Sequence, residues 1–411
     1  MTTAPPHQQA GARRSLGPRF ARLWAAYAVS TYGTWLGFGA FPLIAVLVLD
    51  SGPAQVAALA AAGRAVGALV AVPLGPWVEF RRKRPVMVAM DLTRFAALMS
   101  VPVAFALGWL GFAQLLVVSV VVAAADIAFR AASGAYLRGL VPPEHLLVAN
   151  GRFESTMWSA SMIGPPLGGA AIGVLGPVTT VMADAVSYLL SALGIRSIGG
   201  TEPKPPRAAG PRLRASDLFE GWSHILAHPT LRPLFLNTIV VNGLIMAPEP
   251  LLALLLLREL GFSPWQYGLV FAAPCLGGLV GARLAHRLVA RYGQRTVLLT
   301  AGTLRAIWPL GLAFVQPGIP GMMLVITLQF GLVTCCGLFN PVLATYRLQH
   351  ADPDRLARTL AAWSVSTSAT IASLTAAWGL LAAFTNPRIA IAAAGVLLLA
   401  TPLLLPRTST R

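Results

Sequence analysis

The side chains best placed to do chemistry are ionisable groups inside otherwise apolar stretches. Asp126 and Arg130 lie four residues apart in one such stretch, acid first, so on a helix they share a face and can form an ion pair. An ionisable group inside a membrane costs about 2.5–3.5 kcal/mol on insertion scales, so those that are present usually face a cavity or a partner. Asp126 is therefore a candidate proton carrier, loaded when a conformational change separates it from Arg130. A permanent structural ion pair is the alternative, and Arg64, in an earlier apolar stretch, could serve either residue or neither.

Glu249 is the second candidate, because it is the acid that lies within the apolar stretches of the second half of the chain. It stands between Pro248 and Pro250, and prolines leave helical carbonyls without donors, which is tolerated where a helix is buried in protein or lines a water-filled cavity. We expect Glu249 to bind a cationic substrate or to carry a proton. It also lies about 18 residues, or roughly 27 Å, into its stretch, so a position in water near the outer surface is the alternative.

Membrane-spanning helices are the elements that must position these residues. The 411 residues are 56% hydrophobic and 11% charged, whereas soluble domains carry about 25% charged residues. The sequence thus predicts an all-α polytopic membrane protein. About twelve apolar runs are long enough to cross a bilayer. We expect helices at roughly 21–48, 54–79, 85–109, 113–138, 151–175, 178–197, 231–257, 264–289, 296–315, 320–347, 356–384 and 387–406.

A basic, proline-rich stretch divides these runs into two sets of six. Residues 199–216 are too polar to bury a core, and the amphipathic segment 217–226 that follows is expected to lie along the inner membrane surface. The predicted domains are an N-terminal tail (1–20), a six-helix bundle (21–198), a linker with an interfacial helix (199–230), a second six-helix bundle (231–406) and a C-terminal tail (407–411).

Short motifs recur in the same order in both sets. The basic hairpin at 75–86 is matched more weakly by 281–295, Leu92-Thr93-Arg94 is matched by Thr303-Leu304-Arg305, and 141–146 is matched by 351–356. The chain thus contains two parallel copies of one unit. Parallel six-helix repeats are a layout of secondary transporters, whose ligand site lies between the repeats near the membrane midplane.

The distribution of basic residues predicts orientation in the membrane. Most of the 31 lysines and arginines, which give a net charge of +17, lie on every second loop, and this positive-inside pattern places both termini in the cytoplasm. The charge therefore does not indicate nucleic-acid binding. Three cysteines within apolar runs and six histidines in tails, loops or span ends indicate no metal, no cofactor and no catalytic residues. A phosphate-binding loop of an ATP-driven pump is also absent.

The first hairpin resembles the signature Gly-x-x-x-Asp-Arg-x-Gly-Arg-(Arg/Lys) of the major facilitator superfamily. Gly75, Lys83 and Arg84 fit this pattern and Glu79 replaces its Asp, whereas the residues at 80 and 82 depart from it. The resemblance implies that Glu79 latches the two halves together on the cytoplasmic side. We expect Asp91 and Arg94, at the start of the next span, to belong to the same network. A hairpin whose cations merely anchor a short loop is the alternative.

Two further motifs resemble the same superfamily. Gly164-Pro165-x-x-Gly168-Gly169 is similar to a motif of its antiporters, and its small residues and prolines suit a surface where the halves rock against each other. Close helix packing without that meaning is the alternative. Residues 130–134 resemble the pattern Arg-x-x-Gln-Gly, with Ser in place of Gln. Together with 141–144 and 217–231, these motifs resemble the branch that contains enterobactin exporters and macrolide efflux proteins.

The resemblance implies a fold and a function. The fold is twelve membrane helices in two parallel six-helix repeats. The function is export of a small amphipathic compound in exchange for protons, by alternating access, by a monomer in the lipid bilayer of the cell membrane. An importer or facilitator on the same fold is the alternative, and a membrane-embedded enzyme is a distant one, because no cluster of catalytic side chains is found at one depth.

Overall fold

The computed structural model describes residues 16–50, 59, 69, 73–200, 202, 215–262 and 264–406, and these residues form helices and no strands. The first half contains α1 (Pro18–Leu36), α2 (Ala40–Leu47), α4 (Leu74–Glu79), α5 (Lys83–Ala106), α6 (Phe112–Leu140), η1 (Pro143–His145), α7 (Leu146–Leu175) and α8 (Pro177–Arg196). The linker contains α9 (Ala215–Ala227). The second half contains α10 (Leu231–Met246), α11 (Glu249–Leu254), η2 (Leu255–Glu259), α12 (Pro264–Ala272), α13 (Cys275–Tyr292), α14 (Gln294–Leu304), η3 (Trp308–Phe314), α15 (Gly318–His350), η4 (Pro353–Arg355), α16 (Leu356–Phe384), α17 (Pro387–Ala400) and η5 (Thr401–Leu404).

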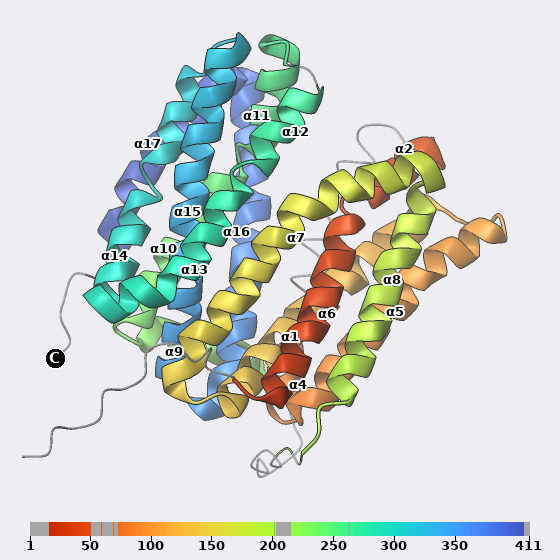
Figure 1. Ribbon diagram of the computed structural model, residues 1–411, viewed down its shortest axis with the longest axis vertical. Helices are drawn as coiled ribbons and strands as arrows, with labels where there is room; N and C mark the ends of the chain where they lie inside the picture. Colours follow the sequence, from red (N-terminus) through yellow and green to blue (C-terminus); the bar gives the residue numbers. More distant parts are fainter. Residues whose placement is uncertain are drawn as a thin grey trace, which may run out of the picture.

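Nine helical stretches among the described residues are long and apolar enough to cross a membrane. The 30-residue helix α7 and α1 with α2 run alongside them (Figure 1). The expected second span, 54–79, falls mostly outside the described residues, and α4 forms its end.

Glycine and proline mark the tight connections between helices. Gly176, with φ of 82°, ends α7, and Pro177 begins α8. Gly293, also with φ of 82°, joins α13 to α14. A side chain with a Cβ is strained at such angles, whereas glycine is not, and proline at the first helical position has no amide hydrogen to leave unpaired.

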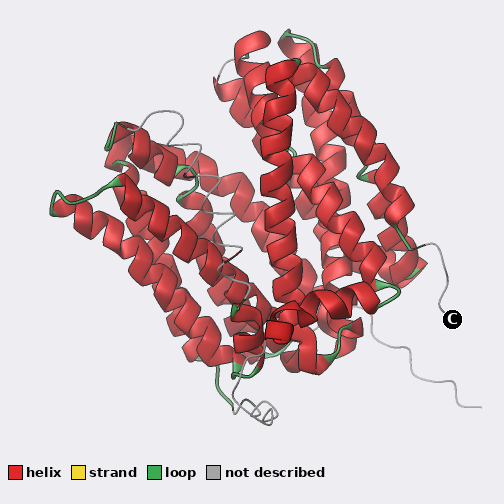
Figure 2. Ribbon diagram, turned by 180° about the vertical axis from the view of Figure 1, so that it is seen from behind, coloured by secondary structure: helices red, strands yellow, loops and turns green. Residues whose placement is uncertain are grey.

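The helices form two groups that meet at one end of the molecule, where α4 and α9 lie, and diverge toward the other end (Figures 1 and 2). We call this end the linker end. Between the halves, α7 lies against α13 and α15, and α16 lies against α4 and α6.

The hydrophobic cores follow the same division. At the linker end one buried cluster contains residues of both halves, such as Leu137 of α6 and Leu348 of α15. Toward the other end, the described clusters around Leu115 and around Val325 each belong to a single half. Apolar packing therefore holds the halves together mainly at the linker end.

Candidate functional site

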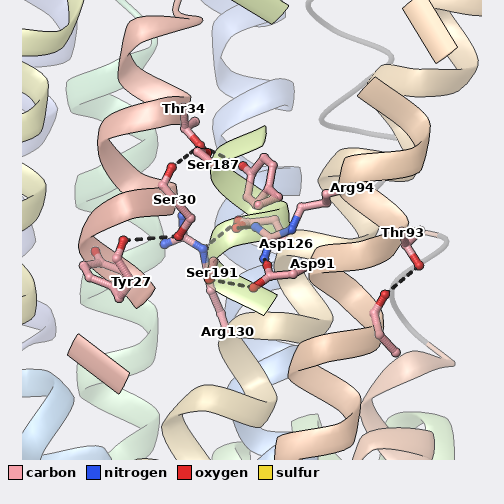
Figure 3. A network of polar contacts seen from close by, with 12 residues as sticks. Tyr27, Ser30, Thr34, Asp91, Thr93, Arg94, Asp126, Arg130, Ser187 and Ser191 are labelled. Carbon is pink, nitrogen blue, oxygen red and sulfur yellow. Dashed lines mark hydrogen bonds and ion pairs between the residues drawn. The ribbon is translucent and has the colours of Figure 1, made fainter. Parts of the chain in front are cut away.

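A chain of ion pairs lies between α5 and α6 in the first half. Asp126 Oδ2 is 2.6 Å from Arg130 Nε, and Asp126 Oδ1 is 3.2 Å from Arg94 Nη1. Arg94 Nη2 is in turn 2.5 Å from Asp91 Oδ1. Figure 3 shows these four side chains pointing toward one another. The spacing of Asp126 and Arg130 thus does produce a pair, and the same aspartate also binds a second arginine.

The α5 end of this chain of ion pairs is buried. Asp91 is 0% exposed and Arg94 is 3% exposed, and Ser191 of α8 donates a hydrogen bond of 2.7 Å to Asp91 Oδ2. The Arg94 guanidinium also lies over the rings of Phe129 and Tyr188, at 4.6 and 4.2 Å. Two carboxylates and two aromatic faces therefore replace the water that this buried cation has lost.

The α6 end is open. The side chain of Arg130 is 69% exposed and that of Asp126 is 35% exposed, so a solute could reach both. The Arg130 pair uses Nε, which leaves its two terminal nitrogens available to an incoming anion or to water. The arrangement can hold Asp126 ionised, and loss of either arginine contact would allow it to take a proton.

Asp91 and Arg94 do not belong to the hairpin network, and that expectation was wrong. Both side chains lie about two to three turns into α5, which begins at Lys83, or roughly 12–17 Å from the hairpin at 1.5 Å per residue. They bind α6 and α8 because those helices pack against that face of α5.

Glu79 does bind the second half of the chain. Its Oε2 is 2.8 Å from Arg358 Nε on α16. Arg358 also pairs with Glu220 on α9, and Glu220 Oε1 lies 3.0 Å from Arg355 Nε. The ring of Phe80, where the superfamily signature has Arg, lies 5.0 Å below the Arg358 guanidinium. One arginine thus joins the hairpin, the linker helix and the second half, and we call these contacts the latch.

Lys83 and Arg84 bind within the first half. Lys83 Nζ donates to the carbonyl oxygens of Val78, Glu79 and Arg81 at 2.6 to 3.0 Å, and so caps the end of α4, which contains Gly75. The Arg84 guanidinium donates to the carbonyls of Ile198 and Gly200 just after α8. The two cations close the hairpin and fix the end of α8.

The antiporter-like motif packs within the first half. A methyl group added to Gly164 or Gly168 of α7 would overlap the backbone at the end of α1, at Trp35 and Leu36. A methyl group added to Gly169 would have no atom of another helix within 4 Å. Pro165 lies inside α7. The expectation that this motif forms a surface between the halves was therefore wrong. Its small residues let α7 cross α1 closely.

Glu249 lies apart from the ion pairs of Asp126. Glu249 is exposed on the first turn of α11, in the other half and at the end away from α9 (Figure 1). Arg64 lies outside the described residues.

A polar stripe on α7, which sequence reasoning missed, connects the halves. Asn150 Nδ2 donates to Thr345 Oγ1 at 2.9 Å. One helical turn later Glu154 Oε1 accepts from Asn340 Nδ2 at 2.8 Å and from Trp158 Nε1 at 2.9 Å.

The stripe continues along α7 toward α13. The Trp158 ring packs on Gly278, and Ser161 Oγ lies 3.6 Å from Cys275 Sγ. Residues 150, 154, 158 and 161 recur at helical spacing, a signal that was available in the sequence. We call this stripe and its partners the seam.

The repeat partner of Arg94 has a different environment. Arg305 is 0% exposed, donates from Nη2 to Asn237 Oδ1 at 2.6 Å and lies 3.7 Å over the ring of Phe339. Its buried contact is thus to an amide rather than to carboxylates. Among the described residues, the ion pairs around Arg94 are thus not repeated around Arg305.

Comparison with known sequences identifies relatives along most of the chain. A sequence profile described as Major Facilitator Superfamily matches residues 23–249 and 234–411. The chain is 29% identical over 349 residues to the multidrug efflux pump Tap of Mycobacterium tuberculosis (strain ATCC 25618 / H37Rv), covering 81% of this chain and 80% of that protein. It is 26% identical over 347 residues to Tap of Mycolicibacterium fortuitum, covering 81% and 82%.

Solved structures share the fold. A bacterial homologue of the iron transporter ferroportin has a TM-score of 0.79 at 16% identity, covering 94% of this chain and 99% of that one. The human organic anion transporter MFSD10 has a TM-score of 0.78 at 15% identity, covering 94% and 100%. The expected fold of twelve helices in two sets of six is confirmed. Because the family profile extends over both halves, the chain belongs to the Major Facilitator Superfamily of membrane transporters.

Proposed function

We propose that this plasma-membrane transporter exports small amphipathic organic compounds in exchange for protons, acting as a monomer by alternating access. The observation that carries the proposal is the arrangement of the halves: they are joined at the linker end by the latch and the seam, and their cores separate toward the other end. Relatives named multidrug efflux pumps over 81% of the chain support export as the direction.

The distribution of positive charge supports a cytoplasmic linker end. The latch, both basic hairpins and the linker helix all belong to that end, and basic loops remain on the cytoplasmic side. In this orientation the conformer described here is closed to the cytoplasm and opens outward. Export then requires the latch and seam to break, so that a compound can enter between the halves from the cytoplasm.

Asp126 is the first candidate for proton binding. It lies at the open end of the ion-pair chain between Arg94 and Arg130. A proton arriving on its carboxylate would cancel the charge that holds Arg130, and the freed guanidinium could then bind an anionic group of the substrate or move toward the second half. Glu249, exposed on α11, is the second candidate for proton binding. It could also be the first group that a cationic compound contacts on the outer side.

Everted membrane vesicles test this function. With a panel of cationic and neutral fluorescent dyes, we expect a dye that the protein transports to release protons from acidified vesicles as it enters. The Asp126→Asn variant should still carry the dye across the membrane but should release no protons, because it cannot carry the proton. Dye binding without proton movement for every compound that binds would refute antiport, and net uptake by whole cells would assign import instead.

A further inference from the structure

Glu154 differs from Asp126 in where its bonds go. Its Oε1 accepts one hydrogen bond from Trp158 on its own helix and one from Asn340 on α15 in the opposite half. Both donors are neutral, whereas Asp126 contacts two guanidinium groups. Glu154 is also partly exposed, so a proton can reach it from water between the halves.

The seam must separate when the linker end opens. The bond from Asn340 to Glu154 crosses the two halves and cannot survive that movement. A hydrogen bond to an ionised carboxylate is roughly twice as strong as a bond between neutral groups, so the charge on Glu154 decides how firmly this part of the seam holds.

We propose that Glu154 is the proton-operated switch of the seam. With its carboxylate ionised, Glu154 holds Asn340 and Trp158 and keeps the linker end closed. A proton from the outer side binds the carboxylate, weakens the bond from Asn340 and lets the halves separate at the linker end. The proton then leaves to the cytoplasm, and the seam closes again. The inference rests on the proposed function and deepens it, since it names a group through which proton entry opens the side where substrate enters.

The charged and titratable groups that interact with Glu154 come from three helices. They are the Arg130 guanidinium of α6, the Tyr27 hydroxyl of α1 and the Cys336 thiol of α15. Arg130 also binds Asp126, so both carboxylates lie within the influence of one cation.

The test measures the distance across the linker end without any substrate. Cysteines that replace Glu144 and Gln349, which are exposed in opposite halves, carry spin labels in a background where Cys275, Cys335 and Cys336 are serines. Electron-spin distance distributions are recorded in lipid nanodiscs at pH 8 and pH 5.5. We expect the fraction with the longer distance to rise on acidification.

Matched variants assign this response to one residue. Glu154→Gln should open the linker end at both pH values, and weakening the one bond that crosses the halves should raise the open-to-closed ratio by about 5-fold at pH 8. Asp126→Asn should keep the pH response, because Glu154 can still titrate, whereas Asn340→Ala should lose it, because the cross-half bond that protonation weakens is gone. A labelled parent with no pH response, or a Glu154→Gln variant that responds like the parent, overturns the proposal.

A conservative variant covers the case in which Glu154→Gln does not fold. Glu154→Asp keeps a carboxyl group but withdraws it by one methylene from Asn340, so the pH midpoint of opening must move, and an unchanged midpoint overturns the proposal. The outcome is independent of the vesicle assay. A seam that responds to pH without any transported dye would count against export alone, and dye-driven proton release with a pH-insensitive seam would count against Glu154 alone.

Discussion

Replacing Arg358 by glutamine should open the linker end strongly. The side chain of Arg358 is 7% exposed and that of Glu79 is 12% exposed, so this is a buried ion pair, and removing one partner of such a pair costs about 3–5 kcal/mol. Glu220 is 27% exposed and keeps its ion pair with Arg355. Most of the free-energy cost therefore comes from leaving Glu79 unpaired. We take about 3 kcal/mol as the cost to the closed conformer. Glu79 becomes hydrated when the halves separate, so the open conformer escapes this cost.

That energy corresponds to a change of about 150-fold in the open-to-closed ratio, at 1.4 kcal/mol for each factor of ten. The distance distribution between spin labels at positions 144 and 349, recorded at pH 8, measures this ratio. The double variant Glu79→Gln/Arg358→Gln should shift the ratio less than Arg358→Gln alone, because no buried charge is left unpaired. Its shift should correspond to about 1 kcal/mol. If the single variant keeps the parent distribution, or if the double variant opens further than the single one, the latch does not control the linker end.

Two further predictions concern packing and buried charge in the first half. Gly168→Ala should destabilise the detergent-solubilised protein by about 1–3 kcal/mol, because its methyl group meets the α1 backbone at Leu36. Gly169→Ala, with nothing within 4 Å, should leave the unfolding temperature unchanged, and equal losses for the two would show that α7 and α1 do not pack this way. Arg94→Met should cost about 3–5 kcal/mol because Asp91 is then buried without its partner. Asp91→Asn/Arg94→Met should recover part of that loss in thermal unfolding, and a double variant less stable than the single one would contradict a paired role.

Local patterns predicted the contacts that one helix makes with itself. Asp126 and Arg130 pair because four residues bring side chains to the same face of a helix. The internal repeat likewise matched Arg94 with Arg305 in sequence. It could not show that Arg94 is held by two carboxylates and Arg305 by the amide of Asn237, because these partners come from other helices.

The latch shows the same limit over a longer distance. The resemblance to the superfamily signature identified Glu79 as an acid that joins the halves, yet its partner Arg358 lies in the last third of the chain. The antiporter-like glycines were recognised as sites of close approach, but the helix that approaches them proved to be α1. A small residue indicates that another helix packs closely there. Which helix it is depends on how the helices cross.

Hydropathy, the positive-inside pattern and the repeat by themselves determined that this chain is a membrane protein of two like-oriented sets of helices, because the cost of placing polar groups in hydrocarbon is set residue by residue. Only the tertiary structure decided that Glu154 meets Asn340 and that Arg358 joins Glu79 to Glu220. These contacts depend on the relative placement of helices that are distant in the sequence. Side-chain shape and burial set that placement collectively, so no local pattern could reveal it.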